Sequence, residues 1–251
     1  MNELVRKLQK ESERIASRYP FPRFYAHFKA PMALARRLFF TDPVIILLRE
    51  ALQPVLQDEL GHGFYHSARV SVDGAALVCV ELESARVDRE SMERLMILAL
   101  IAGLLHDIRR SEQMHAELGA REAGRILTDF PLTRQEVQCV CEAIRNHEAF
   151  TTPRASSHPL FQLVSDCLYD ADKFRWGPDT FTHTLWHLMD HQGLSPQELI
   201  EKFPWGMKGL ARILGTFRTV TGRQFGPEII ETGMQIGKEI YQYLLQNFGE
   251  R

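Results

Sequence analysis

The chain has 251 residues, enough for one sizeable hydrophobic core or two small ones. Its formal net charge of -2 and isoelectric point near 6.6 provide no basic surface for duplex nucleic acid or an anionic membrane. The four cysteines form no CxxC pair, and no apolar run reaches the roughly 20 residues of a membrane-spanning helix. Because the start MNELVRKLQKESER is polar, unlike a signal peptide, we expect a soluble cytoplasmic protein with reduced thiols.

Hydrophobic residues recur with helical periodicity almost throughout, and no sustained alternation of apolar and polar residues indicates a strand. The sequence therefore predicts an all-α fold, a single globular bundle of about ten helices. Capping boxes, Thr133 with Glu136 and Ser195 with Glu198, mark two helix starts. The expected helices cover 2–17, 44–58, 63–84, 91–106, 115–127, 134–147, 158–172, 179–190, 196–217 with a break near Pro204, and 227–248.

The helix expected over 91–106 contains a long apolar run, LMILALIAGLL, that ends in His106-Asp107. A helix that is apolar on every side is buried. Because a buried carboxylate and a buried imidazole need compensating partners, a metal cation is one explanation for this pair. The alternative is a chance dipeptide at a helix end, in which Asp107 pairs with Arg109 or Arg110.

Three other ionisable residues fall on inward helix faces. His66 shares a face with Val70, His147 continues the apolar stripe of Ile144, and Asp172 extends a similar stripe. Each residue alone is more often a hydrogen-bonded core residue than a ligand. Together with the His-Asp pair, however, these imidazoles and carboxylates suit a divalent transition metal such as Mn, Fe, Co, Ni or Zn.

The ordered set resembles the H…HD…D signature of the HD-domain phosphohydrolase superfamily, whose members are all-helical metal-dependent enzymes. The resemblance spans the segment 62–190, half of the chain. It is carried by HSARV, by GLLHDIRR and by YDADKF. The resemblance implies that His66, His106, Asp107 and Asp172 are the ligands of one metal ion.

Two further histidines resemble those of superfamily members that hold two metals. His115 lies in HAELGAREAGRIL and His147 lies in IRNHEAF. The resemblance then implies that Asp107 bridges two ions, as a ligand and a catalytic residue, and that the two histidines hold the second ion. The binuclear interpretation is favoured, and a mononuclear site is the alternative.

The chain departs from the cyclic-dinucleotide phosphodiesterases of the HD-GYP branch. That branch reads HHE and then GYP, whereas this chain has Asn146-His147-Glu148 followed by AFTTPRASS. A cyclic dinucleotide is therefore a disfavoured substrate. Where that branch has Gly-Lys after HDI, this chain has Arg109-Arg110. Since arginine stays protonated, the role of a lysine as proton donor does not carry over.

The implied chemistry is metal-assisted hydrolysis of a phosphoester or phosphoanhydride of a nucleotide or another small phosphate compound. Cationic side chains must meet the charge that develops on the phosphoryl group. Lys173 is the first candidate for a phosphate contact, followed by Arg69, Arg110 and then Arg175; each is alternatively a surface cation or an ion-pair partner. His62 is a candidate proton donor, or else a solvated residue at a helix start.

A non-catalytic alternative is a metal-stabilised module that binds a nucleotide or a protein partner as a regulator. The intact ligand set favours the enzyme, because a degenerate sensor has no need to keep both metal sites. We expect neither duplex nucleic acid nor a membrane as partner. Gly233 and Gly237, one turn apart, allow close helix packing, either within the fold or across a homodimer.

The segment 173–191 follows the last ligand and contains Trp176, which either stacks on a base or caps the pocket. His183, His187 and His191 recur every four residues, the spacing of one polar helix face. For the whole chain, 1–251, we expect a single HD-type domain. It divides into an N-terminal helical extension at 1–60, a metal-site core at 62–190 and C-terminal helices at 191–251 that pack on the core.

Overall fold

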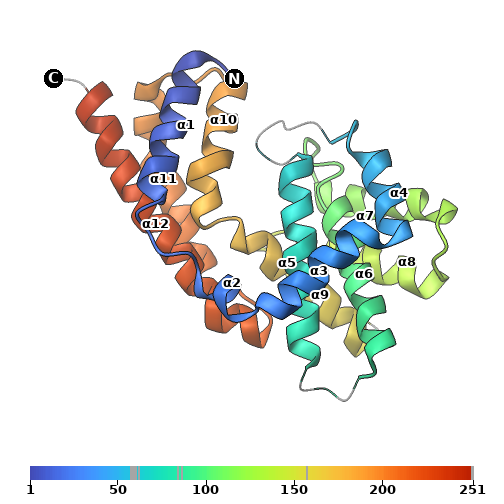
Figure 1. The fold of residues 1–251 in the computed structure, drawn as a ribbon. Helices are drawn as coiled ribbons and strands as arrows, with labels where there is room; N and C mark the ends of the chain where they lie inside the picture. Colours follow the sequence, from blue (N-terminus) through green and yellow to red (C-terminus); the bar gives the residue numbers. More distant parts are fainter. Residues whose placement is uncertain (57–60, 62, 84, 86, 157, 250–251) are drawn as a thin grey trace.

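The computed structural model describes residues 1–56, 61, 63–83, 85, 87–156 and 158–249. These residues form twelve α-helices and no strand, which confirms the predicted all-α fold (Figure 1). The helices are α1 Glu3–Ala16, α2 Arg23–His27, α3 Lys29–Thr41, α4 Pro43–Leu52, α5 Phe64–Leu82, α6 Arg89–Leu105, α7 His115–Ile126, α8 Arg134–Arg145, α9 Pro159–Phe174, α10 Leu185–His191, α11 Pro196–Ile213 and α12 Val220–Phe248. A 3-10 helix, η2 Leu127–Asp129, follows α7, and a π-helix, η3 Thr180–Thr184, precedes α10.

Local sequence signals explain most helix ends. Both expected capping boxes are present, at Thr133 of α8 and at Ser195 of α11. The predicted break near Pro204 is wrong, because α11 continues through this residue. Pro204 is exposed, so water can bind the carbonyl that the proline leaves without a donor.

The N-terminal region contains two helices that were not predicted from the sequence, α2 and α3. They account for the excess over the ten expected helices. Both are anchored by buried side chains, Phe24 of α2 and Met32 and Leu38 of α3. The buried residues of α3 recur every three to four positions, so a helical stripe was present in its sequence but was not recognised. Helix α2 has only 5 residues and is too short to show periodicity.

The larger of two hydrophobic clusters surrounds α6. Leu98, Leu100, Ile101 and Leu104 are almost completely buried, although they point in different directions around the helix. Helices α3, α4, α5, α8 and α9 all contact α6, so every face of the apolar run is covered. The run is therefore a buried core helix, as the sequence predicts.

Helices α5 and α6 approach each other most closely at Gly103. A Cβ atom on this glycine would lie 2.5 Å from Cα of Ser71, closer than real carbon atoms approach. Gly103 lies two residues before the C-terminal end of α6, and Ser71 lies about two turns after the start of α5. The glycine thus brings the end of one helix close to the beginning of the other.

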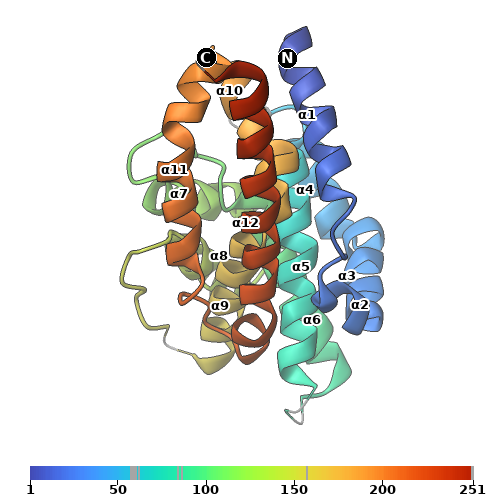
Figure 2. The ribbon, with the colours of Figure 1, turned by 90° about the vertical axis from the view of Figure 1, so that its left-hand side faces the viewer.

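A second hydrophobic cluster is formed by α1, α10, α11, α12 and η3. These helices lie together on one side of the molecule, beside the helices around α6 (Figure 1), and they are in front in the view of Figure 2. Trp186 is fully buried in this cluster, whereas Trp176 and Met234 pack against both clusters and join them. Gly233 and Gly237 face Gly177 and Phe181, so this glycine pair serves packing within the fold.

In the described part of the chain, no helix combines the length and the apolar character needed to cross a membrane.

Candidate metal centre

Six ligand candidates from the sequence converge where several helices begin or end. Their positions are His66 in the first turn of α5, His106 at the end of α6, Asp107 directly after it, His115 at the start of α7, His147 just after α8, and Asp172 near the end of α9. Five of the six are buried, and His115 is partly exposed. The structure therefore brings together side chains that are up to 106 positions apart in the sequence, the 172 − 66 between the first and the last.

The first cluster consists of His66, His106, Asp107 and Asp172. Nε2 of His66 lies 3.2 Å from Nε2 of His106 and 3.3 Å from Oδ1 of Asp172. Oδ2 of Asp107 lies 3.3 Å from Nε2 of His106 and 3.9 Å from Nε2 of His66. Ligand atoms at about 2.1 Å from a metal ion lie roughly 3 to 4 Å from one another. The donor atoms of His66, His106 and Asp107 all lie within 4.8 Å of one another and can share one coordination sphere, and Asp172 lies beside the two histidines.

The second cluster uses the other oxygen of the same aspartate. Oδ1 of Asp107 lies 3.4 Å from Nε2 of His147 and 3.9 Å from Nε2 of His115. Since Oδ2 faces the first cluster, the two oxygens of Asp107 point to different groups of donors. Asp107 is therefore the residue that the two clusters share.

Backbone carbonyls fix the tautomers of two of the histidines. Nδ1 of His106 lies 2.8 Å from the carbonyl of Gly103, and Nδ1 of His147 lies 2.6 Å from the carbonyl of Ile144. A carbonyl only accepts hydrogen bonds, so Nδ1 carries the proton in both rings. In the neutral imidazole Nε2 therefore has the free lone pair, as a metal ligand requires.

The donor set fits a divalent cation. Nε2 of His147 is buried and makes no hydrogen bond to any described residue, although it lies beside Oδ1 of Asp107. Asp107 and Asp172 are only 4% and 5% exposed, so two carboxylates are removed from water within one small volume. Such burial is costly unless positive charge compensates it. Imidazole nitrogens and carboxylate oxygens are typical ligands of first-row divalent metals.

The electrostatics of the clusters shift the pKa values of three candidate ligands, in different directions. Burial lowers the pKa of His106, but the carboxylates of Asp107 and Asp172 outweigh that effect and raise it. Burial raises the pKa of Asp172, but Lys173 and His66 outweigh that effect and hold it well below the ordinary value. Burial, together with the neighbouring His147 and Arg110, lowers the pKa of His115 to about 4. At neutral pH, Asp172 is therefore a carboxylate and His115 a neutral imidazole.

Lys173, the first candidate for a phosphate contact, is buried beside the first cluster. Its ammonium group donates to Oδ2 of Asp172 and to the carbonyl of His147. The same nitrogen lies 4.8 Å from the centre of the Tyr169 ring. These contacts orient Asp172, whose Oδ1 faces the metal ligands. A phosphate contact of Lys173 stays a prediction.

Arg69 and Arg175 belong to a separate ion-pair network. Asp179 accepts from Arg69 at 2.7 Å and from Arg175 at 2.6 Å. Arg175 also donates to Asp73 and to the hydroxyl of Tyr25, which connects the N-terminal segment to α5 and α9. Sequence reasoning overlooked Asp73 and Asp179; the spacing of Asp179 four residues after Arg175 was the available signal.

Arg110 lies in the second cluster. Its Nη1 is 3.1 Å from Nε2 of His115 and 3.8 Å from Oδ1 of Asp107. Arg109 instead pairs with Glu112 at the surface. Of the two alternatives for a pairing partner of Asp107, the structure thus places Arg110 nearby. His62, the candidate proton donor, lies outside the described residues.

Two residues beside the second cluster have left-handed backbone conformations. Met114, directly before His115, has a φ of 59°, and Phe150, three residues after His147, has a φ of 65°. Both side chains are largely exposed. Left-handed conformations are uncommon for non-glycine residues and are often found near functional sites. The sequence gives no warning of them, because neither residue type favours this conformation.

The histidine face of the segment 173–191 does not join either cluster. The rings of His183 and His187 lie 4.2 Å apart, and His183 lies 5.2 Å from Tyr65. Within the described part of the chain, the groups of residues that could hold a metal involve the clusters around Asp107 and not this face. Trp176 packs against both hydrophobic clusters and serves as a core residue.

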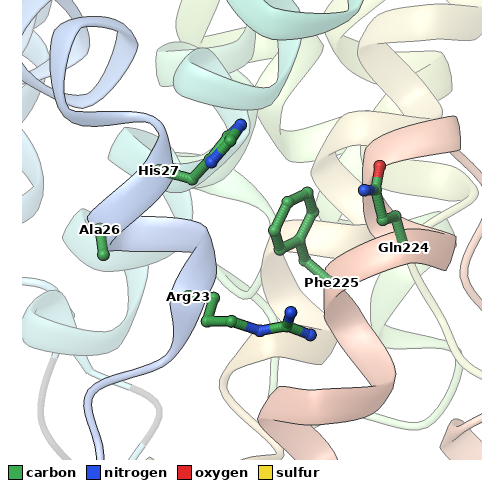
Figure 3. Close-up of a pocket in the computed structure, with 5 residues that line it drawn as sticks. All are labelled: Arg23, Ala26, His27, Gln224 and Phe225. Carbon is green, nitrogen blue, oxygen red and sulfur yellow. The ribbon is translucent and has the colours of Figure 1, made fainter.

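A surface cavity of about 360 Å³ lies away from these ligands (Figure 3). Its lining comes from α2 and α12 and consists of Arg23, Ala26, His27, Gln224 and Phe225. A second cavity of about 230 Å³ is lined in part by Arg69, Arg175 and Asp179. Since these three groups bind one another, their charges are already largely compensated.

The fold and the site define an all-helical protein with buried His/Asp groups that can bind a metal. The clustered residues are compatible with an HD-domain metal site.

No protein-family model matches the chain, and no curated protein matches it. A solved structure that resembles it is that of a predicted HD superfamily hydrolase from an uncultured Thermotogales bacterium. The two chains are 23% identical, the likeness covers 83% of this chain and 93% of the other, and the TM-score is 0.45.

Proposed function

We propose that this protein is a metal-dependent phosphohydrolase that cleaves a phosphoester or phosphoanhydride bond of a nucleotide or another small phosphate compound. The observation that supports the proposal is the position of Asp107, whose two oxygens face separate groups of donors. The ordered HD pattern in the sequence agrees with it. The expected cofactor is two divalent transition-metal ions, chosen from Mn, Fe, Co, Ni and Zn.

The chain's own residues prepare the site for this reaction. When bound, divalent ions lower the pKa of a coordinated water and stabilise charge on phosphoryl oxygens. The carbonyls of Gly103 and Ile144 hold His106 and His147 in the tautomer that presents Nε2. Lys173 holds Asp172 in its ionised form. The buried surroundings strengthen every one of these electrostatic interactions.

Positive charge for a phosphate group is available at the rim of the site. Arg110 is 38% exposed, so its guanidinium is within reach of both the second cluster and solvent. Arg69 is 33% exposed but is bound to Asp179. Arginine binds phosphate through parallel hydrogen bonds, which suits Arg110 to this role.

Metal analysis of the purified protein, followed by a phosphate-release screen, tests the proposal. The screen covers nucleoside mono-, di- and triphosphates with added Mn²⁺, Co²⁺ or Ni²⁺. We expect the wild-type protein to release phosphate and Asp107→Asn to lose this activity. Asp129→Asn is the control and should keep the activity, because its carboxylate is exposed and belongs to neither cluster.

The other outcomes decide between the alternatives. Bound metal without turnover of any phosphoester would favour a metal-stabilised binding module over an enzyme. A protein that binds no divalent metal, and in which Asp107→Ala folds like the wild type, would contradict both functions.

A further inference from the structure

Two consecutive arginines after the His-Asp pair have different environments. Nε of Arg109 lies 3.0 Å from Oε1 of Glu112, and both side chains are over 40% exposed. Arg110 is in the turn that follows Asp107, and its backbone N–H donates to the carbonyl of Asp107 at 3.0 Å. This turn directs the guanidinium of Arg110 back toward the second cluster, where it contacts His115.

The contact involves the atoms that a metal ion would use. Nη1 of Arg110 is 3.1 Å from Nε2 of His115 and 3.8 Å from Oδ1 of Asp107. A guanidinium has only donors, so Nε2 of His115 must accept with its lone pair. A metal ion bound at His115 would require the same lone pair. The guanidinium and the ion therefore compete for one atom, and their positive charges repel each other.

Lys173, the cation beside the first cluster, differs from Arg110 in the atoms that it binds. It binds Oδ2 of Asp172 and leaves Oδ1 directed toward His66 and His106. Its side chain is 3% exposed, so it has no route to solvent. At the first cluster, the protein cation and a metal ion thus use different oxygens of one carboxylate. At the second cluster, Arg110 and a metal ion would instead use the same atoms, Nε2 of His115 and Oδ1 of Asp107. The side chain of Arg110 is 38% exposed, so it can turn toward solvent.

We propose that Arg110 is a displaceable cation of the second cluster. Its guanidinium neutralises Asp107 until a second divalent ion binds, and it then turns toward solvent. The consequence is stepwise loading, in which the first cluster fills at a lower metal concentration than the second. This inference rests on the proposed metal-dependent function and names Arg110 as the residue that sets the affinity of the second ion.

Calorimetric titration of the metal-free protein with Mn²⁺ tests this inference. In Arg110→Gln and in Arg110→Met, we expect the second binding step to tighten by about fivefold, the upper end of what one surface charge contact contributes. The first step should change by less than about threefold. His115→Ala should remove the second step alone and so identify it. Arg109→Gln is the matched control, and its two steps should equal those of the wild type.

The outcomes separate this inference from the proposed function. A wild-type protein that binds no Mn²⁺ at all would contradict both. The role of Arg110 alone would be overturned if the second step had the same affinity in both Arg110 variants as in Arg109→Gln. A weaker second step in the Arg110 variants would overturn it as well. Circular dichroism of the metal-free variants checks folding. Unfolding of both Arg110 variants, with Arg109→Gln folded, would make Arg110 a structural residue and would also overturn the inference.

Discussion

The two donor clusters differ in how firmly the fold holds them. The first cluster is built from α5, the end of α6 and α9, which are central helices of the larger hydrophobic core. The second cluster adds His115, which is partly exposed and follows a residue with a left-handed backbone. We infer that the first cluster is part of the packed core, whereas the second is assembled from turns near the surface and is easier to alter.

The comparison predicts that Asp172→Ala has the largest effect on stability. The substitution leaves the buried ammonium of Lys173 without its carboxylate partner. Removal of one member of a buried pair typically costs about 3 to 5 kcal/mol of unfolding free energy. Urea denaturation in the presence of a chelator measures this loss. His115→Ala, the matched change in the second cluster, should cost less than about 1 kcal/mol.

Recovery of stability in the double variant Asp172→Ala/Lys173→Met would show that the unpaired lysine is the cause. Equal losses in Asp172→Ala and His115→Ala would remove the distinction between a rigid and an adaptable cluster.

Gly103→Ala should separate the helices that carry the first cluster. The added Cβ would meet the backbone of Ser71, which cannot move without a shift of α5. Overpacking of this kind costs about 1 to 3 kcal/mol. Affinity for the first metal ion should fall as well, because the shift moves His66 away from His106. Gly209→Ala in α11 is the control, since its added Cβ meets no atom within 4 Å among the described residues. Normal stability of Gly103→Ala would contradict the proposed close approach.

Acid should weaken the connection between α6 and α8. Arg94 of α6 donates to Glu136 of α8, and this hydrogen bond is the main cause that lowers the pKa of Glu136 to about 2. A carboxyl whose pKa is lowered by folding contributes fully above its ordinary value of 4.5, and the contribution is lost as the pH falls toward 2.

Glu136→Gln removes this contribution, and we expect a loss of about 1 kcal/mol at pH 7. The difference between the variant and the wild type should shrink as the pH is lowered from 5 to about 2.5, as measured by thermal unfolding. A difference that stays constant over this range would show that the ion pair does not stabilise the fold.

Met114→Gly should have the smallest effect on stability, and it should stabilise the fold slightly where the other substitutions destabilise it. Glycine adopts the left-handed conformation of this residue without steric cost, so strain is relieved while unfolded-state entropy increases. We expect a net change of no more than about 0.5 kcal/mol in stability. Phe150→Gly provides the same comparison beside His147. A loss above about 2 kcal/mol in Met114→Gly would show that the exposed side chain makes stabilising contacts.

The sequence predicted which histidines and aspartates lie together better than it predicted the partners of the surrounding cations. His66, His106, Asp107 and Asp172 were found because inward-facing polar residues at helix ends are visible in the periodicity and match an ordered pattern. The partner of Arg69 was not found, because this charged side chain binds a carboxylate that only the tertiary fold brings close to it. Asp179 lies 110 positions from Arg69, and no local pattern links residues at that separation.

The helices show the same limit. Strong periodicity and capping boxes predicted α5, α6, α8 and α9 to within a few residues. Helix α2 was missed because 5 residues are too few to show periodicity, and α3 was missed although Met32, Ala35 and Leu38 recur with helical spacing. At Pro204 a general rule about proline failed, since the exposed side of α11 tolerates the lost hydrogen bond.

Anomalous X-ray diffraction from crystals soaked in Mn²⁺ tests the central claim most directly. The account predicts an anomalous peak among Nε2 of His66, Nε2 of His106 and the facing oxygens of Asp107 and Asp172. At higher Mn²⁺ concentration, a second peak should lie near Oδ1 of Asp107 and Nε2 of His147, with the side chain of Arg110 turned away. The absence of a peak at both clusters would contradict the metal centre.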